Sequence, residues 1–251
     1  MRVLVCIKRV PAPGARIVLT EDGQAIDTKM LSFAISPHEE CAVEEAVQIA
    51  ETHDGEVTVL TLGPPEAEEQ LRSALAVGAQ EAVLIPTDGS DWDSISTASA
   101  ITSAVESLES AGRFDLILFG NESADSGGYQ VGIRVARALG RPVVSGIKRI
   151  DVEGDAVRLR RETAVGSEIY SLPLPAVIGV KEGINLPRYP TLKGRLNAKK
   201  VEVQRIEAER VESGQRMVRL ITPPQEVSAT TILDNATAVV DLLEKLQVVK
   251  S

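Results

Sequence analysis

The sequence predicts an α/β fold: a mostly parallel sheet with helices on both faces, an antiparallel hairpin, and an extended C-terminal arm that ends in a helix. Three observations support this prediction. Short β-branched runs alternate with amphipathic helical segments through most of residues 1–180, as in parallel strands joined by crossover helices. Apolar and polar residues alternate around a turn at 153–155, as in paired antiparallel strands. A charged stretch finally leads to an amphipathic segment near the C-terminus.

The expected strands are short and apolar. Strands that are covered on both faces of a sheet have this composition, because neither side meets water. They are expected at 3–7, 57–62, 82–85, 116–119, 143–144 and 176–180, with the antiparallel hairpin at 148–172. Because helices separate several of these strands, the sheet is expected to be Rossmann-like.

The helix that begins after Ser36 has the clearest start signal. Ser36 can cap the helix, Pro37 suits its first position, and Glu39 completes a capping box. Apolar residues then recur at helical spacing as far as residue 50. Further helices are expected at 65–77, ended by Gly78, and at 94–110, 127–139 and 238–246.

The composition favours one large core. With 251 residues and 43% hydrophobic content, the chain can be stable without a disulfide or a metal ion. The net charge of −9 argues against nucleic acid and anionic membranes as partners. The sequence contains neither an apolar run long enough to span a membrane nor a signal-peptide pattern, so a cytoplasmic location is expected. Cys6 and Cys41 are expected to be small core residues.

The segment from Gly120 to Gly132 is the most informative candidate for ligand binding. In open α/β sheets, ligands bind outside the carboxyl ends of the strands, where loops and helix N-termini offer backbone amides. The candidate loops are 8–15, 35–39, 62–64 and 120–132. The last is rich in glycine and hydroxyl groups, which predicts a nucleotide site, with an ordinary glycine-rich connection as the alternative.

The histidines, His38 and His53, do not suggest catalysis. His53 lies at a helix end, where a solvated cap is expected. His38 either faces a ligand or is exposed in the first turn of its helix. Two isolated histidines are a poor metal site. We therefore expect a binding function, with no catalytic residue and no metal.

Residues 188–205 form a basic segment in an acidic chain. Its cations are Arg188, Lys193, Arg195, Lys199, Lys200 and Arg205, against the single acid Glu202. Tyr189, Leu192 and Leu196 interleave apolar groups with these charges. That mixture suits a protein-docking surface, and a solvated loop is the alternative.

Several motifs spread over nearly the whole chain agree with one another. They are the opening strand at 3–10, Ser-Pro-His-Glu-Glu-Cys at 36–41 and its continuation to 46, Ala-Leu-Ala-Val-Gly-Ala at 74–79, Arg161-Glu162 with Glu168 and 174–177, and Arg-Tyr-Pro-Thr-Leu-Lys-Gly at 188–194 with 198–200. Together they resemble the beta (small) subunit of the electron-transferring flavoproteins. The sequence departs from that family at Ser36, where asparagine is common, and at Ala164 and Val165.

The resemblance implies a heterodimer whose alpha subunit carries the redox-active FAD. This chain would hold a structural AMP, or a second FAD if it is of the electron-bifurcating type. The implied partners are acyl-CoA or related dehydrogenases and a membrane quinone reductase that leads to the respiratory chain. This chain would not be catalytic alone.

The resemblance also assigns residues. The positions that match nucleotide-binding ones are Cys6, Ser36, Pro37, His38, Glu39, Leu62, Gly120, Asn121, Glu122, Ser123, Ala124, Asp125, Ser126, Gly127, Gly128, Tyr129, Gln130 and Val131. The positions that match the partner-docking loop are Arg188, Tyr189, Pro190, Thr191, Leu192, Lys193 and Gly194. Residues 1–187 would form the nucleotide-binding domain, and residues 188–251 the recognition loop and C-terminal arm.

Two other functions stay open at this point. One is an enzyme that cleaves or transfers an adenine nucleotide, which would need a metal or an activated acid in the loop after Gly120. The other is a stand-alone nucleotide sensor similar to universal stress proteins, which would need no flavin partner.

Overall fold

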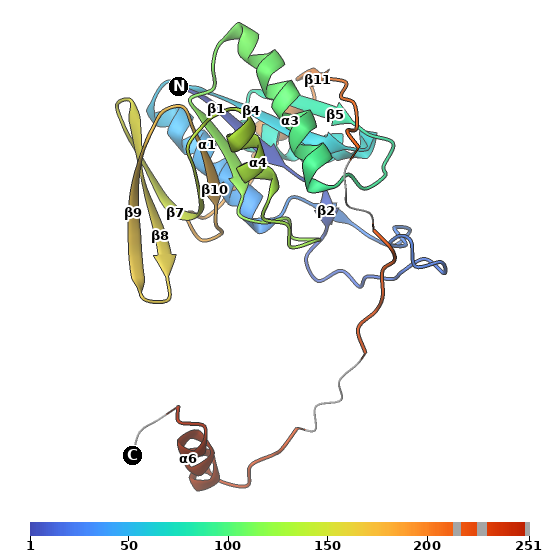
Figure 1. Ribbon diagram of the computed structural model, residues 1–251, viewed down its shortest axis with the longest axis vertical. Coiled ribbons are helices and arrows are strands. Elements are labelled where there is room, and N and C mark those ends of the chain that lie inside the picture. The colour runs from blue at the N-terminus through green and yellow to red at the C-terminus, as the bar shows by residue number, and fades with distance from the viewer. Residues whose placement is uncertain (213–216, 225–229, 249–251) are drawn as a thin grey trace.

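A computed structural model describes residues 1–212, 217–224 and 230–248 (Figure 1). Its main sheet has nine strands in the order β11-β5-β4-β1-β6-β10-β7-β8-β9. These are β1 (Arg2–Ile7), β4 (Glu56–Gly63), β5 (Glu81–Pro86), β6 (Leu116–Gly120), β7 (Val143–Glu153), β8 (Ala156–Thr163), β9 (Gly166–Pro173), β10 (Ala176–Val180) and β11 (Val203–Arg205). The short strands β2 (Val10–Pro11) and β3 (Phe33–Ala34) pair separately. The sheet is parallel from β11 to β7 and antiparallel from β7 to β9.

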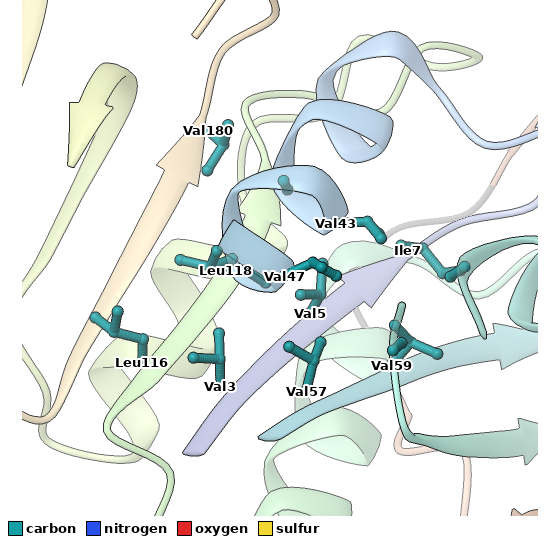
Figure 2. Packing of buried hydrophobic residues seen from close by; sticks show 14 of the residues in the cluster. Val3, Val5, Ile7, Val43, Val47, Val57, Val59, Leu116, Leu118 and Val180 are labelled. Carbon is teal, nitrogen blue, oxygen red and sulfur yellow. The ribbon is translucent and has the colours of Figure 1, made fainter. Parts of the chain in front are cut away.

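Helices cover both faces of the parallel part. They are α1 (Pro37–Thr52), α2 (Glu68–Val77), α3 (Ser94–Leu108) and α4 (Val131–Ala138), with single 3₁₀ turns at Pro65–Ala67 and Glu109–Ala111. Residues Val3, Val5 and Ile7 of β1 pack beneath α1, whose Val43 and Val47 face them in Figure 2. Leu4 and Cys6 point the other way and pack with α3 and α4. The alternation of side chains along a strand therefore divides the core into two layers.

The order of connections creates a topological switch point. From β1 the chain passes through α1 to β4 on one side, and then through α2 to β5. Helix α3 carries it back to β6, which pairs with the opposite side of β1. Loops after β1 and β6 therefore leave the sheet on opposite faces, and the crevice between them is where open α/β sheets bind ligands.

The antiparallel part is larger than the sequence predicted. Strand β7 is continuous from Val143 to Glu153 and so includes both the expected strand at 143–144 and the first arm of the hairpin. A register shift between Ile147 and Arg149 marks the irregularity that lets it pair with β10 and then with β8. Strand β9 adds a third member, so 148–172 belongs to a meander and not to a simple hairpin.

Two further helices follow β10 in the chain. Helix α5 (Leu192–Ala198) packs on α2, and it is followed by β11 at the sheet edge beside β5. Helix α6 (Ala236–Lys245) stands apart from the sheet (Figure 1). Its apolar residues Val239, Val240 and Leu242 are exposed. The predicted arm with a terminal helix is confirmed.

Cys6 and Cys41 are both free and buried, as predicted. His53 is the exposed C-cap residue of α1, which confirms its predicted capping position. Among the described residues, no helix has the length and apolar character needed to cross a bilayer.

Candidate functional site

The crevice at the switch point lies at the carboxyl ends of β1, β4 and β6. Cys6 of β1 is in register with Leu60 of β4 and with Phe119 of β6. Leu62 and Gly120 lie at or near the ends of their strands. The predicted strand-end residues Cys6, Leu62 and Gly120 are therefore brought to one edge of the sheet.

The first turn of α1 packs directly against the end of β6. The capping box is present: the Ser36 side chain accepts from the Glu39 amide at 3.3 Å, and a Glu39 carboxylate oxygen accepts from the Ser36 amide at 3.2 Å. A Cβ atom at Gly120 would lie 2.7 Å from Cγ of Glu39 and 3.3 Å from Cβ of His38. Glycine at position 120 is what allows this close approach.

His38 is buried beside the crevice, so the alternative of an exposed first-turn residue was wrong. Its Nδ1 accepts a hydrogen bond from the Glu182 amide at 2.8 Å, which places the proton of the neutral ring on Nε2. That nitrogen lies 3.6 Å from a carboxylate oxygen of Glu122. His38 thus connects α1 to the segments that follow β10 and β6.

The loop after β6 is closed by its own hydrogen bonds. The Ser123 amide donates to the Gly128 carbonyl at 3.0 Å, and the Gly128 amide donates to the Ser123 hydroxyl at 2.9 Å. Gly127 takes a φ of 59° inside this turn, a value that favours glycine. Because of this turn, α4 begins at Val131 and not at the predicted Gly127. Residues 124–130 are exposed above the crevice.

Two groups at the crevice can bind an anion. Lys8, directly after β1, places Nζ 2.7 Å from Oδ2 of Asp125 and so joins the two loops that flank the crevice. Gln130 precedes α4 without capping it, because its side-chain oxygen accepts from Arg134 at 2.9 Å and from Ser94 at 3.2 Å. The first amides of α4 therefore remain suited to an anion.

Glu39 is an uncharged acid over part of the neutral pH range. Burial raises the pKa of its carboxyl to about 7, although hydrogen bonds from Ser36 and from the Lys8 backbone act in the opposite direction. Desolvation dominates because the carboxyl group lies between α1 and the end of β6.

We predict that Glu39→Gln removes a pH dependence of stability. Between the unfolded value of 4.5 and the folded value of about 7, the folded chain binds more protons than the unfolded chain, so the free energy of unfolding falls as pH rises. Glutamine stays neutral and suits the same capping position. From pH 5 to pH 8, the free energy of unfolding measured with urea should fall by about 2 to 3 kcal/mol more in the wild type than in the variant. Equal losses in the two proteins would show that Glu39 does not titrate in this range.

The predicted docking residues lie away from the crevice, over α1 and α2. Thr191 caps α5 by accepting from the Gly194 amide at 3.0 Å, and α5 packs on α2 at Gly194, where a Cβ atom would clash with the Ala76 carbonyl oxygen. Tyr189 is 94% exposed and Leu192 is 76% exposed. The segment therefore combines a fixed backbone with projecting apolar side chains.

Comparison with known families identifies the family to which the chain belongs. A model of the electron transfer flavoprotein domain matches residues 25–211. The chain belongs to the electron transfer flavoprotein family. The resemblance found in the sequence is thereby confirmed.

Individual relatives in the electron transfer flavoprotein family are beta subunits. The chain is 33% identical to the one of Thermoanaerobacterium thermosaccharolyticum, over 92% of this chain and 88% of that protein. It is 38% identical to the one of Mycobacterium tuberculosis, over 80% and 77%, and 30% identical to the one of Megasphaera elsdenii, over 98% of both. The chain is thus an electron transfer flavoprotein beta subunit, an electron carrier component of a family that binds flavin or adenine nucleotide.

Several residues of these two surfaces were not predicted for this electron transfer flavoprotein subunit. Lys8 lies in the candidate loop 8–15, but the resemblance did not assign it among the nucleotide-binding positions. Glu44 and Glu51, which hold Arg188, are seven residues apart on α1, a spacing that places them on one helix face. Leu186, three residues before Tyr189, is 89% exposed, and its position before Pro187 did not indicate that exposure.

Proposed function

We propose that this chain forms a cytoplasmic heterodimer with an alpha subunit that carries FAD, and that it holds AMP in the crevice between β1 and β6. The observation that carries this proposal is the switch point itself. There the closed loop at 123–128, the uncapped start of α4 and Lys8 meet at one edge of the sheet. Each is a feature that binds phosphate in other α/β proteins.

The proposed binding mode assigns a role to each side of the crevice. The phosphate lies against the amides of the loop 121–131 and exchanges the Lys8–Asp125 ion pair for a pair between Lys8 and phosphate. Adenine lies against the apolar strand ends near Cys6 and Leu62. The capped start of α1, from Ser36 to Glu39, supports the loop from below through its packing on Gly120.

The proposed docking mode uses the segment 188–194. Tyr189 and Leu192 contact an acyl-CoA or related dehydrogenase, and Leu192 enters an apolar pocket on it. The cations of α5, Lys193 and Arg195, attract acidic partners and increase the encounter rate. Electrons enter the FAD of the alpha subunit and leave toward a membrane quinone reductase. This chain supplies the nucleotide site, the scaffold and the docking surface.

Nucleotide analysis tests the proposal. The chain is co-expressed with its alpha subunit, the yellow complex is purified and denatured, and the released nucleotides are quantified by liquid chromatography and mass spectrometry. One AMP and one FAD per heterodimer are expected, because the crevice of this chain and the flavin site of the alpha subunit each hold one nucleotide.

Other outcomes have defined meanings. Two FAD molecules per pair would show that this chain holds a flavin, as in the bifurcating type. A homodimer with nucleotide but no flavin would favour a stand-alone sensor. A colourless chain that binds no nucleotide and no alpha-type partner would overturn the proposal.

A further inference from the structure

Arg188 is bound to helix α1 through its guanidinium group and its backbone. Its Nε donates to Glu44 at 2.9 Å, and its two terminal nitrogens donate to Glu51 at 2.7 and 3.0 Å. One of these nitrogens also reaches Glu44 at 3.1 Å, and the Arg188 backbone amide donates to Glu44 at 3.1 Å. One side chain thus spans two carboxylates, a geometry that the planar guanidinium allows and an ammonium group does not.

The carboxylate at the centre of this arrangement is buried. Burial alone would raise the pKa of the Glu44 carboxyl, but hydrogen bonds from Arg188 and Gln48 outweigh it, and its pKa lies below the ordinary value. Asn185 adds a second tie to the same helix, because its side-chain amide donates to the Cys41 carbonyl at 3.0 Å and to Glu45 at 2.9 Å. The chain is therefore attached to α1 at both 185 and 188.

The other end of the segment is attached to α2. Thr191 caps α5, and the absence of a side chain at Gly194 brings α5 against the Ala76 carbonyl. Arg72 of α2 donates to the carbonyl oxygens of Ala198 and Val201, both at 2.5 Å. Two helices of one layer therefore fix the backbone on either side of Tyr189 and Leu192.

We propose that Arg188 is a positioning residue: its clamp on Glu44 and Glu51 holds the segment 185–192 in the conformation in which Tyr189 and Leu192 contact the dehydrogenase. This inference rests on the docking function proposed above. Arg188 is only partly exposed, and its guanidinium is occupied by α1, whereas Leu186, Tyr189 and Leu192 point into solvent. Its role is therefore to present its neighbours and not to contact the partner.

The physical reason is preorganisation. A segment that is ordered before the encounter does not lose backbone and side-chain freedom on binding. A weakened clamp leaves the charge and the apolar side chains in place. The segment then loses backbone and side-chain freedom at each docking event, which lowers its affinity for the dehydrogenase. The expected consequence is a higher KM for this carrier in the dehydrogenase reaction, with electron transfer after docking unchanged.

Arg188→Lys in the intact heterodimer tests this inference, because lysine keeps the charge and loses the two-carboxylate geometry. With an acyl-CoA dehydrogenase and saturating acyl-CoA, the KM for the heterodimer should rise about tenfold while kcat stays within about twofold. The matched control is Arg149→Lys, which alters an exposed arginine that also donates twice to one carboxylate, Asp151. That control should leave both parameters unchanged.

Hydrogen–deuterium exchange supplies a second readout. In Arg188→Lys the amides between 186 and 192, apart from Pro187 and Pro190, which have none, should exchange faster in the free heterodimer, while exchange of β1 and β6 and the bound FAD content stay as in wild type. Unchanged exchange and an unchanged KM would overturn the inference, and so would a loss of kcat without a change in KM.

The docking proposal and the positioning inference can fail separately. If Leu192→Ala raises the KM and Arg188→Lys does not, the surface is correct and the clamp has no role. If neither variant alters the KM, or if the wild-type heterodimer accepts no electrons from the dehydrogenase, the docking proposal itself fails and the inference fails with it.

Discussion

Leu192→Ala is expected to raise the KM of the heterodimer for an acyl-CoA dehydrogenase by about 10- to 100-fold. Leu192 is 76% exposed in the chain, so it can transfer nearly a whole side chain from water to an apolar pocket. Burying such a side chain contributes about 1.5 to 3 kcal/mol, and each 1.4 kcal/mol corresponds to about tenfold in affinity. Steady-state kinetics with the heterodimer as the varied substrate measure the effect.

A control variant separates docking from a general loss of exposed apolar surface. Val165, at the turn between β8 and β9, is 98% exposed and lies outside the proposed docking segment. Val165→Ala should leave the KM unchanged. An equal rise in the KM for the two variants, or no rise for Leu192→Ala, would contradict docking through this side chain. Thermal unfolding should stay near wild type in both, because neither side chain is in the core.

Gly194→Ala is expected to destabilise the chain by about 1 to 2 kcal/mol and to displace α5 from α2. The new Cβ atom would clash with the Ala76 carbonyl oxygen, and a backbone atom within a helix cannot move aside as a flexible side chain can. Overpacking of this kind costs about 1 to 3 kcal/mol, which outweighs the gain of about 1 kcal/mol in helix propensity when alanine replaces glycine. Urea unfolding measures the loss, and the KM should rise as for Leu192→Ala.

The matched control for this prediction is Asn197→Ala on the same helix. Asn197 is exposed. Its truncation should therefore change the free energy of unfolding by no more than a few tenths of a kcal/mol and should leave the KM unchanged. If Gly194→Ala were as stable as Asn197→Ala, α5 would have to tolerate a wider separation from α2 than its packing indicates.

Much of the fold could be predicted because local signals agreed with the tertiary structure. The capping box at Ser36 marks the start of α1 correctly, and the buried parallel strands have continuous apolar sequences. Strand β9 was harder to recognise, because Ser167, Ile169 and Ser171 alternate weakly and most of the strand is exposed. Strand β11 is three residues long in a charged segment. Its existence depends on pairing with β5, which no local pattern reveals.

The candidate site could be predicted in position better than in detail. Strand ends and glycine-rich loops are visible in the sequence, so the strand-end and loop residues of the crevice could be predicted from it. The hydrogen bonds between Ser123 and Gly128, which delay the start of α4, depend on the turn conformation of Gly127. The pair Lys8–Asp125 and the clamp on Arg188 join residues more than 100 positions apart. Contacts at that separation follow from strand order and cannot be found by a local motif.

The place of β10 between β6 and β7 bears on the order in which this chain can assemble. The ribosome releases β6 first, then β7, β8 and β9, and β10 afterwards. Strand β10 must therefore insert between β6 and β7, which are synthesised earlier. A nascent chain that ends before residue 176 can therefore join β5, β4, β1 and β6, but it cannot attach the meander to them. The Asn121 amide donates to the Val180 carbonyl at 2.8 Å, so the loop above the crevice gains this anchor only when β10 is in place. The edge of the sheet at the candidate crevice is thus completed only after β10 has been synthesised.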